Sequence, residues 1–199
     1  MAAGLIGLGA ASLLSFALVN ADESSAIRRY DALLAPELPL TAHERAYGNE
    51  RLVKVYTRLR NPEAALQYAQ RAVASDPAND RYWGNVGSIL YNLKRYSEAA
   101  TYYEEAAHRG STRPEVYYYL AQSLIQLGRP DEALQPAQRA IDLGGESLRS
   151  LFALGLARAQ SGDLAGARRA WDHLLQMWPE DVRTRHAYEY YLGGSAPKP

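Results

Sequence analysis

The sequence repeats itself with a fixed period from residue 46 onward, and this period limits the folds available to the chain. Alanine recurs at one position in steps of 34 residues, at Ala65, Ala99, Ala133 and Ala167. An apolar residue recurs with the same step at Leu52, Val86, Leu120 and Leu154. Four repeats follow one another without insertion, at 46–79, 80–113, 114–147 and 148–181. A period of this length predicts stacked supersecondary units that share one continuous core.

The second repeat shows most clearly which residue types occupy the repeated positions. Its large and small residues are Trp83, Val86, Gly87, Ala99, Tyr103 and Ala106. This pattern on two amphipathic helices resembles the tetratricopeptide repeat, a family of helix-turn-helix units. The resemblance implies an all-α fold, a right-handed α-solenoid. Residues 182–192 have the length of one closing helix, and we expect the tail 193–199 to be flexible.

Small residues predict where the helices approach each other closely. Gly87, Ala121 and Gly155 occupy one repeated position of the first helices, and the alanines at 99, 133 and 167 occupy one of the second helices. Two helices can pack tightly only where one of them presents small side chains. We therefore expect the neighbouring aromatic residues to fill the core rather than to bind a ligand; they are Trp83, Tyr103, Tyr117 and Trp171.

Several helix starts are visible in the sequence. Thr41 and Glu44 match a capping box, which predicts a helix start just before the first repeat. Within the repeats, we expect Asn61, Ser97 and Asp163 to cap second helices. Pro62 and Pro130 suit a first helical turn.

The first 21 residues differ from the rest of the chain, because residues 1–20 contain no charged side chain. As a helix, Ala2 to Val19 would be about 27 Å long, against about 30 Å of membrane hydrocarbon. Every fourth residue is small along one stripe, where another membrane helix could pack closely: Ala3, Gly7, Ala11 and Ser15. We predict a membrane helix over residues 2–19, joined to the repeats by a connector at 22–45 that contains a short helix.

A cleaved signal peptide is the alternative for residues 1–21. Small residues before Asp22, in "VNA", suit a signal peptidase, whereas the segment lacks the basic residues that usually begin a signal peptide. The signal-like end favours an extracytoplasmic repeat domain, in the periplasm if the source is bacterial. The alternative protein is exported and soluble.

In proteins that this sequence resembles, the first helix of each repeat lines a concave groove that holds a peptide or a partner's helix. The register places thirteen residues in this predicted groove: Arg51, Lys54, Arg58, Arg81, Asn85, Ser88, Asn92, Tyr118, Tyr119, Gln122, Gln126, Phe152 and Leu156. The predicted groove is basic and rich in amides in its first half, and aromatic and apolar in its second. Such a surface suits a segment with acidic and hydrophobic parts.

Composition argues against several other functions. The formal net charge is +0, so no overall basic field would recruit nucleic acid. There is no cysteine, and the four histidines include no i,i+4 pair, so we expect no metal site and no cofactor. Paired acidic residues such as Glu104 and Glu105 fall on expected solvated helix faces, which is a poor setting for general acid–base catalysis. An enzyme acting on a small-molecule substrate is therefore not expected.

These observations leave two functional hypotheses. The favoured one is a noncatalytic protein–protein interaction scaffold, anchored through residues 2–19, that organises or stabilises a membrane or envelope protein complex. Its partners would be other subunits of that complex. The alternative is a soluble exported adaptor or assembly chaperone that binds client peptides.

Overall fold

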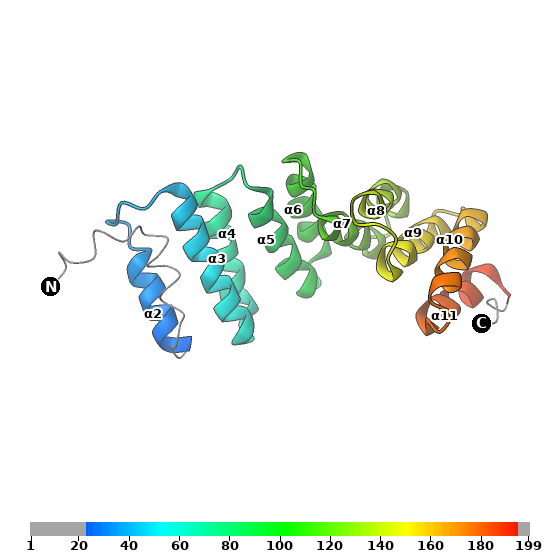
Figure 1. Cartoon of the computed structure of the whole chain (residues 1–199), viewed down its shortest axis with the longest axis horizontal. Coiled ribbons are helices and arrows are strands. Elements are labelled where there is room, and N and C mark those ends of the chain that lie inside the picture. The colour runs from blue at the N-terminus through cyan, green and yellow to red at the C-terminus, as the bar shows by residue number, and fades with distance from the viewer. Residues whose placement is uncertain (1–22, 195–199) are drawn as a thin grey trace. The chain divides into compact units, whose positions relative to one another are not determined.

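The computed structural model describes residues 23–194, and in this range the chain forms ten α-helices and no strand (Figure 1). The helices are α2 (Glu23–Leu33), α3 (Ala42–Arg58), α4 (Pro62–Ser75), α5 (Asp80–Asn92), α6 (Tyr96–His108), α7 (Pro114–Gln126), α8 (Pro130–Gly144), α9 (Leu148–Gln160), α10 (Leu164–Met177) and α11 (Val182–Leu192). Short turns join successive helices, so each 34-residue step of the sequence carries two helices. We call α3, α5, α7 and α9 first helices, and α4, α6, α8 and α10 second helices.

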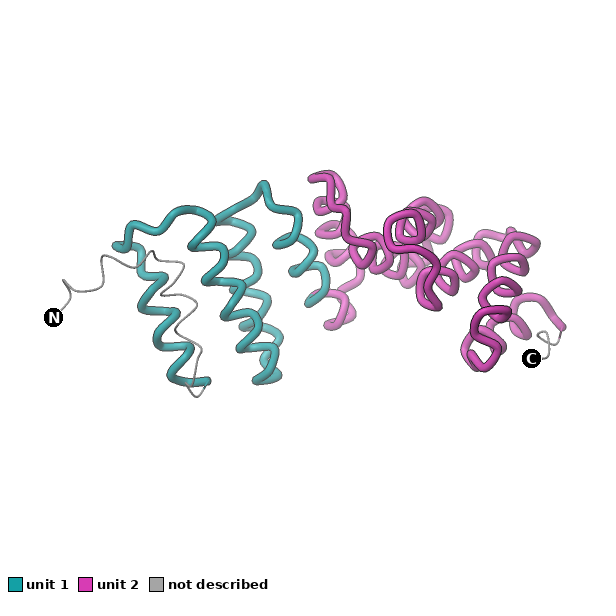
Figure 2. The backbone as a smooth tube through the Cα atoms, viewed as in Figure 1, with its two compact units in different colours: residues 1–89 teal, residues 90–199 magenta. Residues whose placement is uncertain are grey.

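The chain divides into two compact units, residues 1–89 and residues 90–199, with the boundary inside α5 (Figure 2). Among residues 23–194, no helix combines the length and the apolar character that a membrane span requires. The predicted membrane helix, with Ala3, Gly7, Ala11 and Ser15, lies outside the described residues.

Helix starts follow the sequence predictions with one exception. The capping box is confirmed, since Thr41 Oγ1 accepts a hydrogen bond from the Glu44 backbone N–H and Glu44 accepts one from that of Thr41. Asn61 and Asp163 also cap their helices, at α4 and α10. The prediction for Ser97 was wrong. Helix α6 begins at Tyr96, one residue earlier, and the Arg95 guanidinium binds the Glu98 carboxylate over this first turn.

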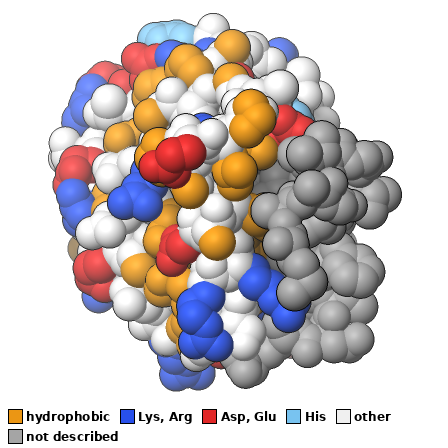
Figure 3. Space-filling view, turned by 90° about the vertical axis from the view of Figure 1, so that its left-hand side faces the viewer, with side chains coloured by type: hydrophobic (Ala, Val, Ile, Leu, Met, Phe, Trp, Pro, Cys, Tyr) orange, Lys and Arg blue, Asp and Glu red, His pale blue; other side chains and the backbone are white. Residues whose placement is uncertain are grey.

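The core of unit 1 includes a contact between the connector helix α2 and the first helix α3. Tyr30 of α2 and Leu52 of α3 are both fully buried there, and Tyr47 and Tyr56 pack around them. Figure 3 looks onto the α2 end of the molecule and shows hydrophobic side chains interspersed with charges of both signs. The short helix predicted in the connector thus forms one wall of the unit 1 core.

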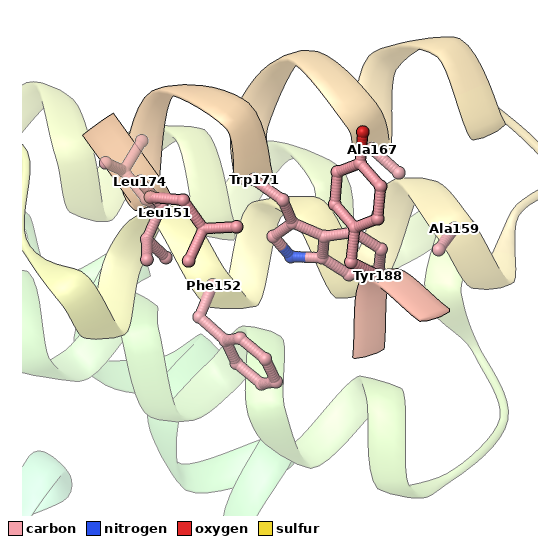
Figure 4. Packing of buried hydrophobic residues seen from close by; sticks show 8 residues of the cluster. Leu151, Phe152, Ala159, Ala167, Trp171, Leu174 and Tyr188 are labelled. Atoms are coloured by element: carbon pink, nitrogen blue, oxygen red, sulfur yellow. The ribbon is translucent and has the colours of Figure 1, made fainter. Parts of the chain in front are cut away.

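Unit 2 contains a core around Trp171 of α10, which is 0% exposed (Figure 4). Phe152 and Leu151 reach this core from α9, and Tyr188 reaches it from α11. Gly155 is needed at this contact, because a Cβ atom there would lie 2.2 Å from Trp171 Nε1. The prediction that a small residue allows close helix packing at this position is confirmed.

The other predicted packing residues behave similarly. The alanines at 99, 121, 133 and 167 are each 0% exposed, and the Tyr103 and Tyr117 side chains are buried. Trp83 is only half-buried, and its indole N–H donates a hydrogen bond of 2.9 Å to the Pro77 carbonyl. Trp83 therefore fills the core less completely than predicted, because a backbone acceptor near the surface holds its polar edge.

The buried alanines lead to a stability prediction. Replacing Ala133 or Ala99 by leucine should lower the free energy of unfolding by about 1–3 kcal/mol, because the added atoms overpack a filled helix contact. Urea denaturation followed by circular dichroism measures this loss. Ala165→Leu, at an exposed position of α10, is the matched control and should change stability little. Equal effects of the buried and exposed substitutions would contradict the packing role.

Candidate functional site

The first helices of unit 1 present a basic, partly exposed face. Lys54, Arg58 and Arg81 are exposed, and Asn85 and Ser88 are half-buried. The backbone positions these side chains because α3 and the unit 1 part of α5 bury their other faces, through Leu52 and Val55 on α3 and through Val86 on α5. The basic and amide character predicted for this part of the groove is therefore found on the surface of unit 1.

A buried carboxylate organises this face. Glu50 of α3 is 3% exposed, and its Oε1 lies 2.5 Å from Arg81 Nη2 and 3.6 Å from Lys54 Nζ. The Lys54 and Arg81 side chains remain 50% and 52% exposed. One carboxylate balances one positive charge, so this cluster of Glu50, Lys54 and Arg81 carries an excess positive charge at the surface. Burial raises the pKa of the adjacent Tyr82, and the Glu50 carboxylate adds to that rise.

Arg51, which the sequence places in the predicted groove, is half-buried and lies at the contact with α2. Its guanidinium lies 5.9 Å from the centroid of the Tyr47 ring. It also hydrogen-bonds Tyr30 of α2; burial raises the pKa of Tyr30, and this bond opposes the rise. Arg51 is therefore engaged within unit 1, because α2 covers the side of α3 from which it projects.

Aromatic side chains gather on the first helices of unit 2. Tyr119 of α7 contacts three other tyrosines, with ring centroids 5.0 Å from Tyr91, 6.0 Å from Tyr103 and 4.9 Å from Tyr118. Tyr118 and Tyr119 are half-buried, so each keeps some surface for contact with a partner.

The remaining predicted groove residues differ widely in exposure. Gln126 of α7 and Asn92, in the part of α5 that belongs to unit 2, are exposed, and Leu156 is half-buried. Gln122 and Phe152 are 7% and 8% exposed, so they offer little surface.

Two arginines that the sequence reasoning missed lie beside these aromatics. The Arg183 guanidinium, from α11, is 4.1 Å from the centroid of the Phe152 ring. Arg149 of α9 and Arg183 both lower the pKa of Tyr118, against the rise that burial causes. A signal for them exists in the sequence, because steps of 34 residues from Arg81 lead to Glu115, Arg149 and Arg183. The aromatic half of the predicted groove is thus partly basic.

Cavities on the described surface lie elsewhere, and two of them are well formed. One of about 530 Å³ in unit 1 is lined by residues of α2, α3 and α4, including Asp31 and Tyr68. The Tyr68 hydroxyl donates a 2.9 Å hydrogen bond to Asp31, and burial together with this carboxylate raises the pKa of Tyr68 to about 12. The other, of about 460 Å³, lies among α6, α7 and α8 in unit 2. No predicted groove residue lines either cavity.

The part of the chain that the structure describes offers few side-chain arrangements suited to metal binding or acid–base catalysis. Residues 23–194 contain no cluster of three or more His, Cys, Asp or Glu side chains that could hold a metal ion. His173 Nε2 lies 2.7 Å from Glu146 Oε2, and both of these side chains are solvent-exposed. What the described surface offers is charged and aromatic side chains on helix faces, and such side chains recognise other molecules by contact.

Comparison with known proteins supports the assignment of the repeats. Two sequence models of the tetratricopeptide repeat match residues 51–114 and 90–147. The chain is 31% identical over 134 residues to U-box domain-containing protein 70 of Oryza sativa subsp. japonica, and 26% identical over 103 residues to DnaJ homolog subfamily C member 7 of Mus musculus. These matches cover 67% and 52% of the chain but only 15% and 21% of those two proteins.

Solved structures show the same fold at low sequence identity. The region shared with a crystal structure of MamA covers 94% of this chain and 96% of the MamA chain, with a TM-score of 0.71 and 18% identity. A tetratricopeptide repeat protein from Parabacteroides merdae covers 92% of the chain and 71% of its own length, with a TM-score of 0.73 and 18% identity. YrrB, described as a repeat protein with an unusual peptide-binding site, covers 73% of the chain and 77% of its own length, with a TM-score of 0.66 and 22% identity. At these identities the likeness concerns the fold.

Proposed function

We propose that this chain, an all-α solenoid of tetratricopeptide repeats, is a noncatalytic scaffold that binds other proteins through its first helices. The observation that carries the proposal is the cluster of Glu50, Lys54 and Arg81. A buried carboxylate holds two half-exposed cations in fixed positions, and this arrangement suits recognition of a partner better than it suits packing. Groups fixed before binding lose less conformational entropy when a partner arrives.

The finer form of the proposal is a scaffold anchored in a membrane through residues 2–19, with an extracytoplasmic repeat domain that organises or stabilises a membrane or envelope complex. Its support is the uncharged, apolar composition of the first 20 residues, which would suit a membrane helix. The second candidate is a cleaved, exported adaptor or assembly chaperone. The small residues before Asp22, which suit a signal peptidase, favour that candidate.

Membrane fractionation distinguishes the anchored scaffold from the cleaved, exported protein. The full-length chain should stay with membranes through carbonate and high-salt washes, because burial of an apolar helix does not depend on screened charges. Mass spectrometry should find an intact N-terminus. A mature chain that starts at Asp22 and is recovered in the soluble fraction would establish the exported form instead.

Purification from detergent-solubilised membranes, with mass spectrometry of the co-eluting proteins, tests the scaffold role itself. Lys54→Glu, which reverses one exposed charge of the cluster, should reduce recovery of partners. Arg169→Glu, at an exposed arginine of the second helix α10, is the control and should leave recovery unchanged. A protein that elutes without any stoichiometric partner under these conditions would contradict the scaffold proposal.

A further inference from the structure

Arginine and aromatic side chains form a periodic row on unit 2. Arg149 and Arg183 are one repeat period apart, as are Tyr118 and Phe152. The Arg183 guanidinium lies 4.1 Å from the centroid of the Phe152 ring. Burial raises the pKa of the half-buried Tyr118, and the positive charges of Arg183 and Arg149 oppose this rise. We call these four residues the arginine–aromatic row. The row crosses three helices, α7, α9 and α11, so its members come from three successive steps of the repeat.

The two arginines of the row have no acidic partner among residues 23–194. Four other arginines of unit 2 do: the Arg95, Arg109, Arg129 and Arg158 guanidiniums pair with Glu98, Glu105, Glu132 and Asp163 respectively. Arg149 and Arg183 instead remain exposed, and the positive charge of both is left unbalanced beside an aromatic surface.

The positions of these arginines within their helices are also unfavourable for the fold. Each is the second residue of its helix, where the positive end of the helix dipole repels a cation. Every helix from α3 to α8 carries an acidic residue in its first turn, whereas α9, α10 and α11 carry none there, although the Asp163 and Asp181 side chains cap α10 and α11. Arg149 and Arg183 therefore gain neither a favourable dipole interaction nor an internal ion pair, and both guanidiniums are available to a ligand.

We propose that the arginine–aromatic row binds an extended segment of a partner protein in which acidic side chains stand next to hydrophobic ones, an inference that rests on the proposed scaffold function. An arginine guanidinium can donate two parallel hydrogen bonds to one carboxylate. The Phe152 ring lies 4.1 Å from the Arg183 guanidinium and restricts where that side chain can move. Tyr118 supplies contact area for the hydrophobic neighbour at low rotamer cost. Glu115, at the equivalent position of α7, would repel an acidic residue and so limits the acid-binding part of the row to α9 and α11.

The test begins with a random peptide library displayed on phage and selected against the full-length chain in detergent. Selection against the wild-type protein should enrich peptides in which Asp or Glu adjoins an aromatic or aliphatic residue. The variant Arg149→Glu with Arg183→Glu should lose this enrichment. Arg169→Glu is the matched control, because Arg169 is an exposed arginine of the second helix α10 and undergoes the same change of charge.

The affinity of a synthetic copy of the most enriched peptide is then measured by fluorescence anisotropy. The double variant should bind it at least about tenfold more weakly, since truncated anchor contacts commonly cost this much. Binding to the wild type should also weaken with salt. The melting temperature of the double variant should be unchanged or higher, because glutamate suits the first helical turn. A role of these arginines in folding would instead lower it, and that result would overturn the inference.

Three other results would overturn the inference: enriched peptides without acidic residues, acidic peptides that bind the double variant equally well, and no enrichment at all. The proposed function is judged separately, by partners that co-purify from membranes. If the double variant retains all of them, the scaffold stands and its binding surface lies elsewhere, for example at the cluster of Glu50, Lys54 and Arg81.

Discussion

Replacing Trp171 by alanine should destabilise the protein by about 3–5 kcal/mol, the largest effect we expect from a single substitution. The indole is 0% exposed and packs against Phe152, Leu174 and Tyr188 (Figure 4). Its removal would leave a cavity where α9, α10 and α11 meet. The surrounding helices cannot close it easily, because Gly155 has no side chain with which to fill the space. Urea denaturation measures the change in the free energy of unfolding.

Trp83→Ala is the matched control for this substitution. Trp83 is half-buried, so its replacement should lower the free energy of unfolding less than the replacement of Trp171 does. The contact with Gly155 provides a second check. Gly155→Ala should destabilise the protein that contains Trp171, because the new Cβ would lie 2.2 Å from the indole nitrogen. The same change should be tolerated once Trp171 is alanine. Equal costs for the two tryptophans, together with additive effects of the Gly155 and Trp171 changes, would show that this core is loosely packed.

Much of the fold could be predicted because the repeat constrains both the size of the residue at each repeated position and the helix face on which that residue lies. Gly155 shows this: the 34-residue step marks it as a close contact, and the structure places Trp171 against it. Ser97 shows the limit. Sequence pattern favours a serine cap there, but the Arg95–Glu98 ion pair spans a first turn that starts one residue earlier. The 34-residue repeat does not show whether a side-chain cap or an ion pair will form at the start of a given helix.

The candidate site could be predicted less well, because it depends on contacts that the repeat does not contain. Lys54 and Arg81 are exposed as the register indicates, yet nothing in the period shows that the buried Glu50 holds them. Arg51 is engaged by Tyr30, which lies in the connector outside the repeats. Phe152 is buried although its register position predicts a groove residue, since it packs in the Trp171 core and Arg183 from the closing helix lies over its ring.

Replacing Arg81 by alanine should destabilise the protein by about 2–4 kcal/mol, because it leaves the buried Glu50 carboxylate without its close partner. An exposed ion pair would contribute at most about 1 kcal/mol. Glu50 differs from such a pair because it is 3% exposed, and its second carboxylate oxygen, Oε2, has no hydrogen-bond partner among the described residues. Lys54 Nζ, at 3.6 Å and half-exposed, can replace only part of the lost interaction.

A double-mutant cycle tests whether the cost arises from the stranded charge. Glu50→Gln removes the charge and keeps a similar shape, so it should recover most of the stability that Arg81→Ala loses. Lys54→Ala is the matched control, since it removes the more distant cation and should cost less than Arg81→Ala. Urea denaturation of the four proteins of the cycle gives the coupling energy between positions 50 and 81. A coupling energy near zero would mean that water reaches Glu50 and that the cations of this face are not fixed before a partner binds, which would remove the physical basis for recognition at unit 1.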